Sequence, residues 1–276
     1  MTLDRNWLLA AARAEREALG RTVQYTAPEA WDAESPCEGW RNKDVLAHLA
    51  ASDVAAASII ADEEATEVEE YRKTLEARPF RGTEWNDWTV EQRRDVPTLQ
   101  LATEWGRAAD LFLSRAAKAD DDGWQDRMVA WTAGDIRLGY LVQARVAEWW
   151  AHGEDVREGG LLPPRREHNP IYALNDLAIR MIPYGLSLEG RSFPGRSVRI
   201  DLEGVGEGSW HQGLEAGKMP AEGKRPDAYI EGRGYEFASV AAKRADPDVC
   251  LYEGLLQVGG DVRLADVVLR ALRSFP

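Results

Sequence analysis

Two segments of the sequence place imidazole and carboxylate side chains at spacings that suit a metal ion. Glu148 and His152 are four residues apart in EWWAHGEDV, and a helix puts residues at that spacing on one face, about a turn apart. His48, in DVLAHL of another expected helix, would supply a third ligand. Two imidazoles and one carboxylate form a set that leaves a position open for water or substrate in catalytic zinc sites. The sequence thus predicts a divalent metal site, with Zn²⁺ favoured and Ni²⁺, Fe²⁺ or Mn²⁺ also suited.

An ordinary structural role is the alternative for these three residues. A histidine on an apolar helix is usually hydrogen-bonded within the core, and a glutamate four residues before a histidine is common by chance. The other two histidines lack a ligand partner at a useful spacing. His168 lies in the charged segment RREHN, and His211 follows Trp210 in a glycine-rich region, so we expect surface or strand positions for both.

Several neighbours of the expected ligands are candidates for supporting roles. Asp155 and Asp44 could orient the imidazoles, because a metal-bound histidine usually donates its other N–H to a carboxylate or carbonyl. Asp44 could equally favour the helix dipole, since it lies in the first turn of its helix. Arg145, three residues before Glu148, is a candidate for holding an acidic substrate. Cys37 is expected to be a small packing residue, with a reactive thiol as the alternative.

Tryptophans fall into two groups near these segments. Trp149 and Trp150 flank the expected ligand face and are expected in the core. Trp85 and Trp88 lie in residues 78–97, a Pro-, Gly- and Trp-bearing stretch that we interpret as a long loop between helices. Aromatic side chains on such a loop could close over a hydrophobic substrate.

The first part of the chain has the pattern of a helical bundle. Apolar residues recur at helical spacing in four segments, and consecutive helices of this length favour an antiparallel four-helix bundle. The segments are residues 3–20, 42–70, 98–119 and 138–157. We therefore expect a metal-binding helical domain over residues 1–160.

The pattern changes after residues 160–170, which are rich in proline and charge and are expected to be a linker. A helix is expected over residues 171–188. Residues 197–203 then alternate apolar and polar side chains, as a half-buried strand does. Shorter strands are expected over 208–214 and 227–232, and helices over 235–244 and 264–273. The sequence therefore predicts a small α+β domain over residues 171–276.

Composition limits the partners of this protein. The chain has 276 residues and a net charge of −13, which disfavours nucleic acid and anionic membrane surfaces as partners. Two cysteines, Cys37 and Cys250, form no disulfide framework, and no signal peptide or transmembrane stretch is evident. We expect a cytoplasmic protein, monomeric or homodimeric, that acts on a small molecule.

Three segments resemble one known family. SPCEGWRNKDVLAHLAASD at 35–53, RVAEWWAHGEDV at 145–156 and QVGGDVRLADVVLRAL at 257–272 resemble the mycothiol-dependent maleylpyruvate isomerase family of the DinB-like superfamily. The resemblance spans nearly the whole chain. It implies an α+β fold with an N-terminal DinB-like four-helix bundle and a sterol-carrier-like C-terminal domain. It also implies that His48, Glu148 and His152 are the metal ligands.

The resemblance further implies a reaction that uses mycothiol as cosubstrate. A metal-bound thiol loses its proton readily, and the thiolate is the nucleophile. It could displace a leaving group as an S-transferase, the version we slightly prefer, or isomerise a double bond by adding and leaving. A metal hydrolase with an activated water and a non-catalytic metal-binding protein are the alternatives. An acidic substrate would need cationic groups, for which the sequence offers Arg145, Arg180, Arg199, Arg263 and Arg270.

Overall fold

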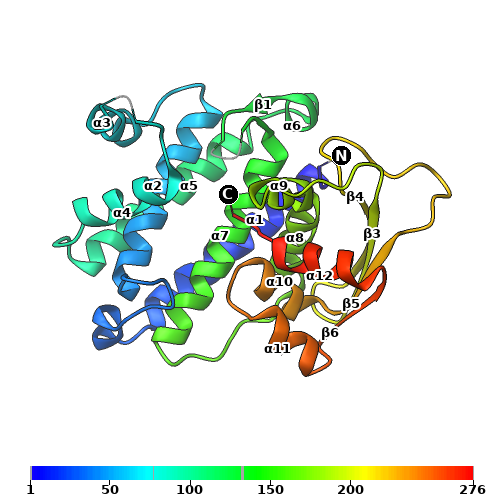
Figure 1. Ribbon diagram of the computed structural model, residues 1–276. Coiled ribbons are helices and arrows are strands. Elements are labelled where there is room, and N and C mark those ends of the chain that lie inside the picture. The colour runs from blue at the N-terminus through cyan, green and yellow to red at the C-terminus, as the bar shows by residue number, and fades with distance from the viewer. Residues whose placement is uncertain (1, 77, 132–133, 276) are drawn as a thin grey trace. The chain divides into compact units, whose positions relative to one another are not determined.

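The computed structural model describes residues 2–76, 78–131 and 134–275 of the chain. These residues form two compact units, one up to Arg165 and the other from Arg166 to Phe275 (Figure 1). The boundary falls within residues 160–170, where proline and charged residues are concentrated. The helical unit holds all the residues expected to bind metal, and each unit is described by itself below.

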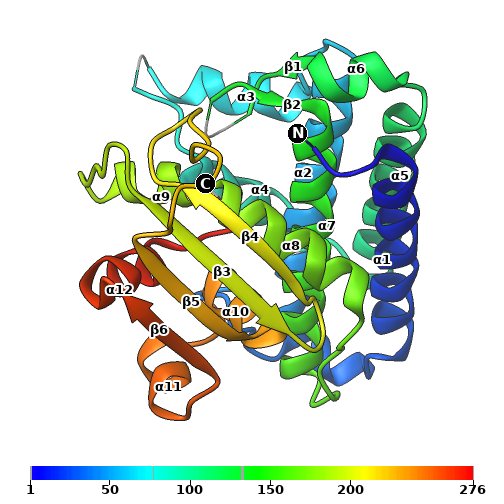
Figure 2. The same ribbon diagram turned by 90° about the vertical axis from the view of Figure 1, so that its right-hand side faces the viewer.

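Four long helices form the core of the first unit, as expected for a DinB-like bundle. Helix α2 packs against α5 and α7, and α1 packs against α7 and α5 (Figure 2). No helix in the described part of the chain is both long and apolar enough to span a bilayer. The four helices are α1 (Arg5–Tyr25), α2 (Asn42–Ile60), α5 (Thr98–Ala116) and α7 (Leu138–Gly159).

Local signals explain where these helices begin. The Asp4 carboxylate accepts a hydrogen bond from the backbone N–H of Trp7 at 2.8 Å, which caps α1. At the start of α2, the Asp44 carboxylate accepts from the backbone N–H of Arg41 at 2.9 Å. Each contact satisfies a backbone donor that a helix leaves without an internal partner.

Two expectations for the first unit are wrong. The helix expected over residues 42–70 ends at Ile60, and a separate helix α3 follows at Thr66–Thr74. Asp62 adopts a φ of 58°, and the acidic run that begins there is unfavourable at the negative end of a helix. The loop expected over residues 78–97 contains helix α4 (Gly82–Gln92), which buries Trp85 and Val90 on one side.

Short elements complete the first unit. They lie in its connections and were not expected from the sequence, because each has too few residues to establish a periodicity. They are a 3₁₀ helix (Pro28–Asp32), helix α6 (Asp121–Asp126), and the antiparallel strands β1 (Met128–Val129) and β2 (Ile136–Arg137).

The second unit is a four-stranded mixed sheet with helices packed on it. Its strand order is β4-β3-β5-β6, in which only β3 and β5 are parallel, and Figure 2 shows the four strands side by side. Val198, Ile200 and Leu202 of β3 are buried while Arg199 and Glu203 are exposed, so the alternation in the sequence is confirmed. The strands are β3 (Ser197–Glu203), β4 (Gly208–Gly213), β5 (Ala228–Arg233) and β6 (Leu256–Gly260).

The helices of the second unit depart from expectation in one place. The single helix expected over residues 171–188 is two helices, α8 (His168–Arg180) and α9 (Ile182–Leu188). Pro183 lies in the first turn of α9, where it lacks the N–H that a continuous helix would need. The remaining helices are α10 (Gly234–Ala241), α11 (Pro247–Tyr252) and α12 (Val262–Ala271). Helix α11 and strand β6 were missed in the sequence.

A close approach ties the start of α2 to the end of α7. A Cβ atom placed on Gly159 would lie 2.3 Å from the side-chain nitrogen of Asn42. Asn42 is fully buried and its amide donates to the carbonyl of Ala30 at 2.9 Å. The turn that precedes α2 is therefore held beside the last turns of α7, where Asp155 lies.

Gly159→Ala is expected to destabilise the protein by about 1–3 kcal/mol, the usual cost of overpacking a well-filled site. Gly20→Ala in α1 is the matched control, because its Cβ would meet only the Arg16 side chain at 3.5 Å. Replacing a helical glycine with alanine there should stabilise by up to about 1 kcal/mol. Thermal melts of the two variants should shift in opposite directions, and an unchanged melting temperature for Gly159→Ala would contradict this packing.

Candidate metal centre

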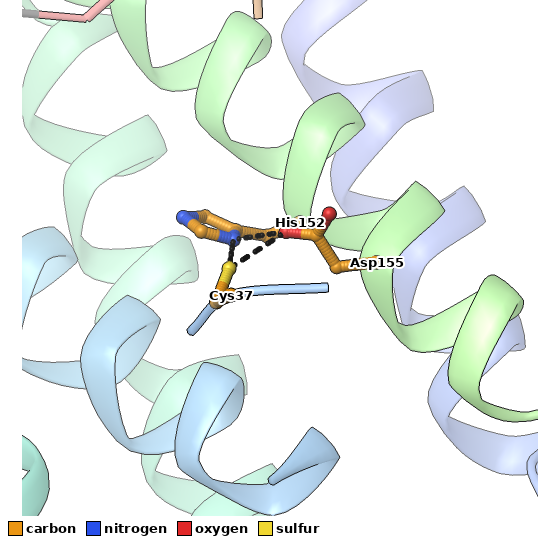
Figure 3. Close-up of side chains that lie close together, drawn as sticks. All are labelled: Cys37, His152 and Asp155. Atoms are coloured by element: carbon orange, nitrogen blue, oxygen red, sulfur yellow. Dashed lines mark hydrogen bonds and ion pairs between the residues drawn. The ribbon is translucent and has the colours of Figure 1, made fainter. Parts of the chain in front are cut away.

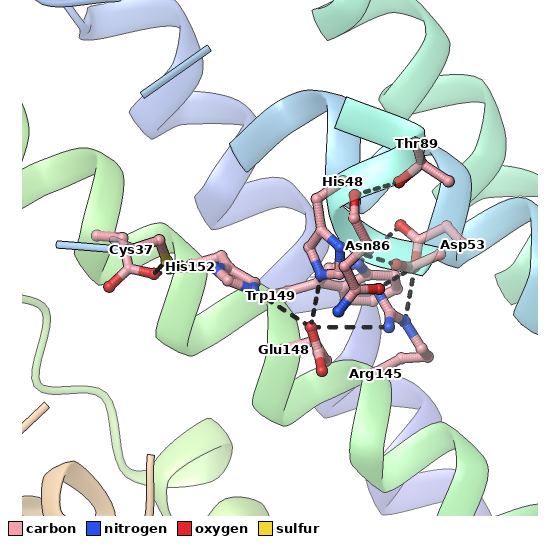
Figure 4. Close-up of polar contacts among 11 residues, drawn as sticks. Cys37, His48, Asp53, Asn86, Thr89, Arg145, Glu148, Trp149 and His152 are labelled. Carbon is pink, nitrogen blue, oxygen red and sulfur yellow. Dashed lines mark hydrogen bonds and ion pairs between the residues drawn. The ribbon is translucent and has the colours of Figure 1, made fainter. Parts of the chain in front are cut away.

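Three side chains expected to bind metal converge in the helical unit. One donor atom from each of His48, Glu148 and His152 lies within 4.8 Å of the others. The Glu148 Oε2 atom is 3.3 Å from His48 Nε2 and 3.4 Å from His152 Nε2. Figure 4 shows this carboxylate between the two imidazoles. His48 comes from α2, and the other two lie one turn apart on α7.

Burial shapes the chemistry of His48. Its side chain is 4% exposed, and the Trp40 ring lies against it with centroids 5.2 Å apart. Removal from water lowers the pKa of His48 below its ordinary value, against the opposing effect of the hydrogen bond that the ring makes to the Glu148 carboxylate. Ser52 Oγ lies 3.3 Å from His48 Nδ1, where it can accept the proton of an imidazole that offers Nε2 to an ion.

His152 has the opposite electrostatic environment. Burial would lower its pKa, but hydrogen bonds with Asp155, Cys37 and Glu148 outweigh burial and raise the pKa well above the ordinary value. The Nδ1 atom is 2.8 Å from Asp155 Oδ2, so this carboxylate accepts the Nδ1 proton. The contact fixes the ring with Nε2 toward Glu148, as an outer-shell carboxylate does for metal-bound histidines.

Glu148 remains ionised although it is surrounded by protein. Burial would raise its pKa, but the hydrogen bonds with His152 and His48 and the charge of Arg145 hold it well below the ordinary value. Arg145 Nη1 lies 3.9 Å from Glu148 Oε2. A carboxylate that keeps its negative charge in such surroundings is suited to hold a cation.

Arg145 is buried and forms an ion pair with Asp53. Its Nε atom and Nη2 atom each lie 2.7 Å from Asp53 Oδ1, and the Trp149 indole donates to the other oxygen of Asp53 at 2.9 Å. Burial raises the pKa of Asp53 to about 6, against the opposing effects of Arg145 and Trp149. Arg145 therefore lies between the carboxylates of Asp53 and Glu148.

Asp155 and Asp44, the two acids expected to orient the imidazoles, make different contacts. Asp155 lies against His152, as described above. The Asp44 carboxylate instead receives two hydrogen bonds from the Arg41 guanidinium, each 3.0 Å, in addition to capping α2. The interpretation of Asp44 as a helix-terminus residue therefore agrees with its contacts, and Ser52 occupies the position beside His48 Nδ1.

Trp85 and Trp88 are not loop residues, because both belong to α4. Trp85 is 6% exposed and packs with Ala51, Tyr71 and Leu75, while Trp88 lies against the same cluster. This cluster anchors α4 to α2. Of the tryptophans expected in the core, Trp149 and Trp150 are both buried.

The remaining candidates, including Arg263, belong to the second unit. His168 Nδ1 accepts from the backbone N–H of Gly206, and His211 Nε2 lies 2.9 Å from Ser197 Oγ. Three of the arginines considered for an acidic substrate form ion pairs inside this unit: Arg180 with Asp176, Arg199 with Asp201, and Arg270 with Asp248 and Asp266.

Sequence reasoning missed Asp53 and Ser52, and it favoured a packing role for Cys37 with a reactive thiol as the alternative. Asp53 is the one acid between His48 and Ile60 on an otherwise apolar helix, and a buried charge in such a stretch signals a partner elsewhere. Cys37 Sγ lies 3.2 Å from Asp155 Oδ2 and 3.8 Å from His152 Nδ1. The turn before α2 therefore contributes Cys37 and Trp40 to the surroundings of both histidines.

The donor set fits a divalent ion. It combines a neutral imidazole at His48, a second imidazole fixed by a carboxylate, and an ionised Glu148. These are the ligand types of catalytic zinc sites with an open position, and they also suit nickel, iron and manganese.

Comparisons with known proteins agree with this architecture. The family model described as the mycothiol maleylpyruvate isomerase N-terminal domain matches residues 12–157, a range that includes every residue of the cluster. Uncharacterised proteins from two strains of Mycobacterium tuberculosis are each 23% identical over 220 residues, which cover 79% of this chain and 81% of theirs.

Two solved structures share the fold. The crystal structure of the mycothiol-dependent maleylpyruvate isomerase aligns with a TM-score of 0.60 and 16% identity over 89% of this chain and 91% of that one. A mutant of that enzyme in which a histidine is replaced by alanine aligns with a TM-score of 0.61 and 16% identity over 94% and 95%. At this identity the likeness establishes the fold, with the helical bundle followed by a small α+β domain.

The two histidines of the cluster are expected to titrate apart in metal-free protein. The pKa of His48 should lie below the ordinary value of 6.5 because the ring is buried. The pKa of His152 should lie above that value because the ring is hydrogen-bonded to Asp155. Proton NMR of the imidazole resonances over a pH series measures both. Asp155→Asn should lower the pKa of His152 and leave that of His48 nearly unchanged, with Glu158→Gln on the exposed side of α7 as control. A common midpoint near 6.5 for both rings would contradict the described environments.

Proposed function

The chain belongs to the family of the mycothiol maleylpyruvate isomerase N-terminal domain, and from that premise we propose that it is a metal-dependent enzyme that uses a low-molecular-weight thiol. Mycothiol is the thiol we propose, and the substrate is a small electrophile. The observation that carries the proposal is the meeting of His48, Glu148 and His152 within 4.8 Å. Family membership supports the thiol, and the donor set supports the ion.

The proposed ligands are His48 Nε2, His152 Nε2 and a Glu148 oxygen. A divalent ion held there would supply positive charge that favours the thiolate over the thiol, and the thiolate is the nucleophilic form. Zn²⁺ suits three such ligands with one open position. Ni²⁺, Fe²⁺ and Mn²⁺ are compatible with the same ligands.

The surrounding side chains have separable tasks in this proposal. Ser52 and Asp155 each contact the Nδ1 atom of one histidine and thereby orient its Nε2 atom. Asp53 holds Arg145 beside Glu148. The positive guanidinium of Arg145 therefore lies near the Glu148 carboxylate and leaves the carboxylate oxygens to the proposed metal ion. Trp40 covers one face of His48 and limits the access of water to that ring.

Isomerisation and S-transfer differ in what happens to the thiol. Addition of the thiol to a conjugated double bond, rotation and elimination regenerate the thiol, so it acts in catalytic amounts. Displacement of a leaving group forms a thioether and consumes one thiol per turnover. The family and its structural neighbours are named for an isomerase, which favours the first course over the S-transfer that the sequence alone suggested.

The charged groups near the cluster bear on which substrate is proposed. In the helical unit, the arginine beside the cluster is already paired with Asp53, so it does not supply a free cation for a dicarboxylate. We therefore propose a small unsaturated electrophile and include maleylpyruvate as one substrate to be tested.

The test is a turnover assay of zinc-loaded protein on maleylpyruvate and other small unsaturated electrophiles, with and without mycothiol. Turnover should require the thiol, persist when thiol is substoichiometric, and fall to background in His48→Ala. His211→Ala in the second unit is the control, and it should retain turnover. Stoichiometric loss of thiol would show S-transfer instead of isomerisation. Turnover that is equal without any thiol would contradict the proposal, and a hydrolysed product would then indicate a hydrolase that uses an activated water.

A further inference from the structure

A second set of metal-ligand atoms lies on the other side of the His152 ring. Cys37, His152 and Asp155 each place one donor atom within 4.8 Å of the other two. The separations are 3.8 Å from Cys37 Sγ to His152 Nδ1, 3.2 Å from Sγ to Asp155 Oδ2, and 2.8 Å from Nδ1 to Oδ2. Figure 3 shows the three side chains pointing toward one another.

These residues are held in place by different parts of the fold. His152 and Asp155 are three residues apart on α7, which puts them on one helix face. Cys37 comes from the turn before α2, which Gly159 and Asn42 hold close to α7. Asp155 is 1% exposed and His152 8% exposed, while Cys37 is only half-buried. The set therefore combines two buried side chains on one helix with a partly exposed residue from the preceding turn.

We propose that Cys37, His152 and Asp155 form a second metal site, which takes a thiophilic divalent cation. A thiolate and a carboxylate would together balance the charge of such an ion, with the imidazole as a neutral third ligand. Thiolate with imidazole selects softer ions such as Zn²⁺ over Mg²⁺ or Ca²⁺. Binding through a thiolate and through the Nδ1 lone pair would release the protons that a thiol and a protonated Nδ1 carry.

The second site and the His48–Glu148–His152 set are alternatives because they share one ring. His152 Nε2 faces Glu148, and Nδ1 faces Cys37 and Asp155. A neutral imidazole has one lone pair for an ion, so a cation on Nδ1 leaves Nε2 protonated and removes His152 from the first set. An excess of a thiophilic ion would therefore draw His152 away from the first set of ligands.

Cobalt distinguishes the two sites without an activity measurement. Co²⁺ bound by a thiolate shows an intense near-ultraviolet charge-transfer band, whereas Co²⁺ bound by imidazole and carboxylate shows only weak visible bands. Glu148→Gln and His48→Ala each weaken the first set and leave Cys37, His152 and Asp155 intact. Titration of either variant with Co²⁺ should develop the near-ultraviolet band, and excess Zn²⁺ should abolish it.

Adding Cys37→Ser to either variant should remove the band, while adding Cys250→Ser should retain it, since Cys250 is buried in the other unit. Two first-set variants are used so that a folding defect in one, checked by circular dichroism, leaves the test intact. A folded first-set variant that shows no band, or a band that survives Cys37→Ser, overturns the proposal. The outcome is independent of the proposed function, because the band requires neither a thiol cosubstrate nor the first set of ligands.

Discussion

The carboxylate of Glu148 is the charge around which the helical unit is organised. Its Oε2 atom lies 3.3 Å from His48 Nε2, 3.4 Å from His152 Nε2 and 3.9 Å from Arg145 Nη1. A charge largely enclosed by protein is tolerated only where it is paired and hydrogen-bonded, so the two histidines and Arg145 lie against it. Asp53 neutralises Arg145, and the Trp149 indole satisfies Asp53. The result is an anionic ligand kept ionised between two imidazoles, which is the electrostatic requirement for holding a cation.

The contact between the ends of α2 and α7 extends this organisation to a second layer. Because Gly159 has no side chain, Asn42 can pack against it, and the turn at 34–41 then lies beside the last turns of α7. That turn carries Cys37 to Asp155 and Trp40 to His48. Each imidazole is therefore fixed from behind, one by a hydroxyl and the other by a carboxylate that also meets a thiol. The different partners explain why the pKa values of the two histidines shift in opposite directions.

The sequence predicts those features that depend on spacing along one element. The four-residue spacing places Glu148 and His152 on one face of α7, and alternation identifies β3 with its buried residues. Features that depend on distant partners were missed: Asp53 and Arg145 are 92 residues apart, and Cys37 and Asp155 are 118 apart. The break at Pro183 was missed because apolar residues continue on both sides of it, whereas the break at Asp62 was signalled by the acidic run that begins there. Trp85 and Trp88 were misread because neighbouring proline and glycine suggested a loop where packing favours a helix.

The most direct test of this account is the zinc affinity of metal-free protein, measured by competition with a chromophoric chelator. In a Cys37→Ser background, which removes the proposed second site, the protein should bind one Zn²⁺ per chain. Adding Glu148→Gln should weaken binding by more than about 100-fold, since losing an outer-shell partner alone costs about 10- to 100-fold. Adding Glu158→Gln, an exposed change on the same helix, should leave the affinity unchanged. Equal affinity with and without Glu148→Gln in that background, or a wild type that binds neither zinc, nickel nor iron, would contradict the account.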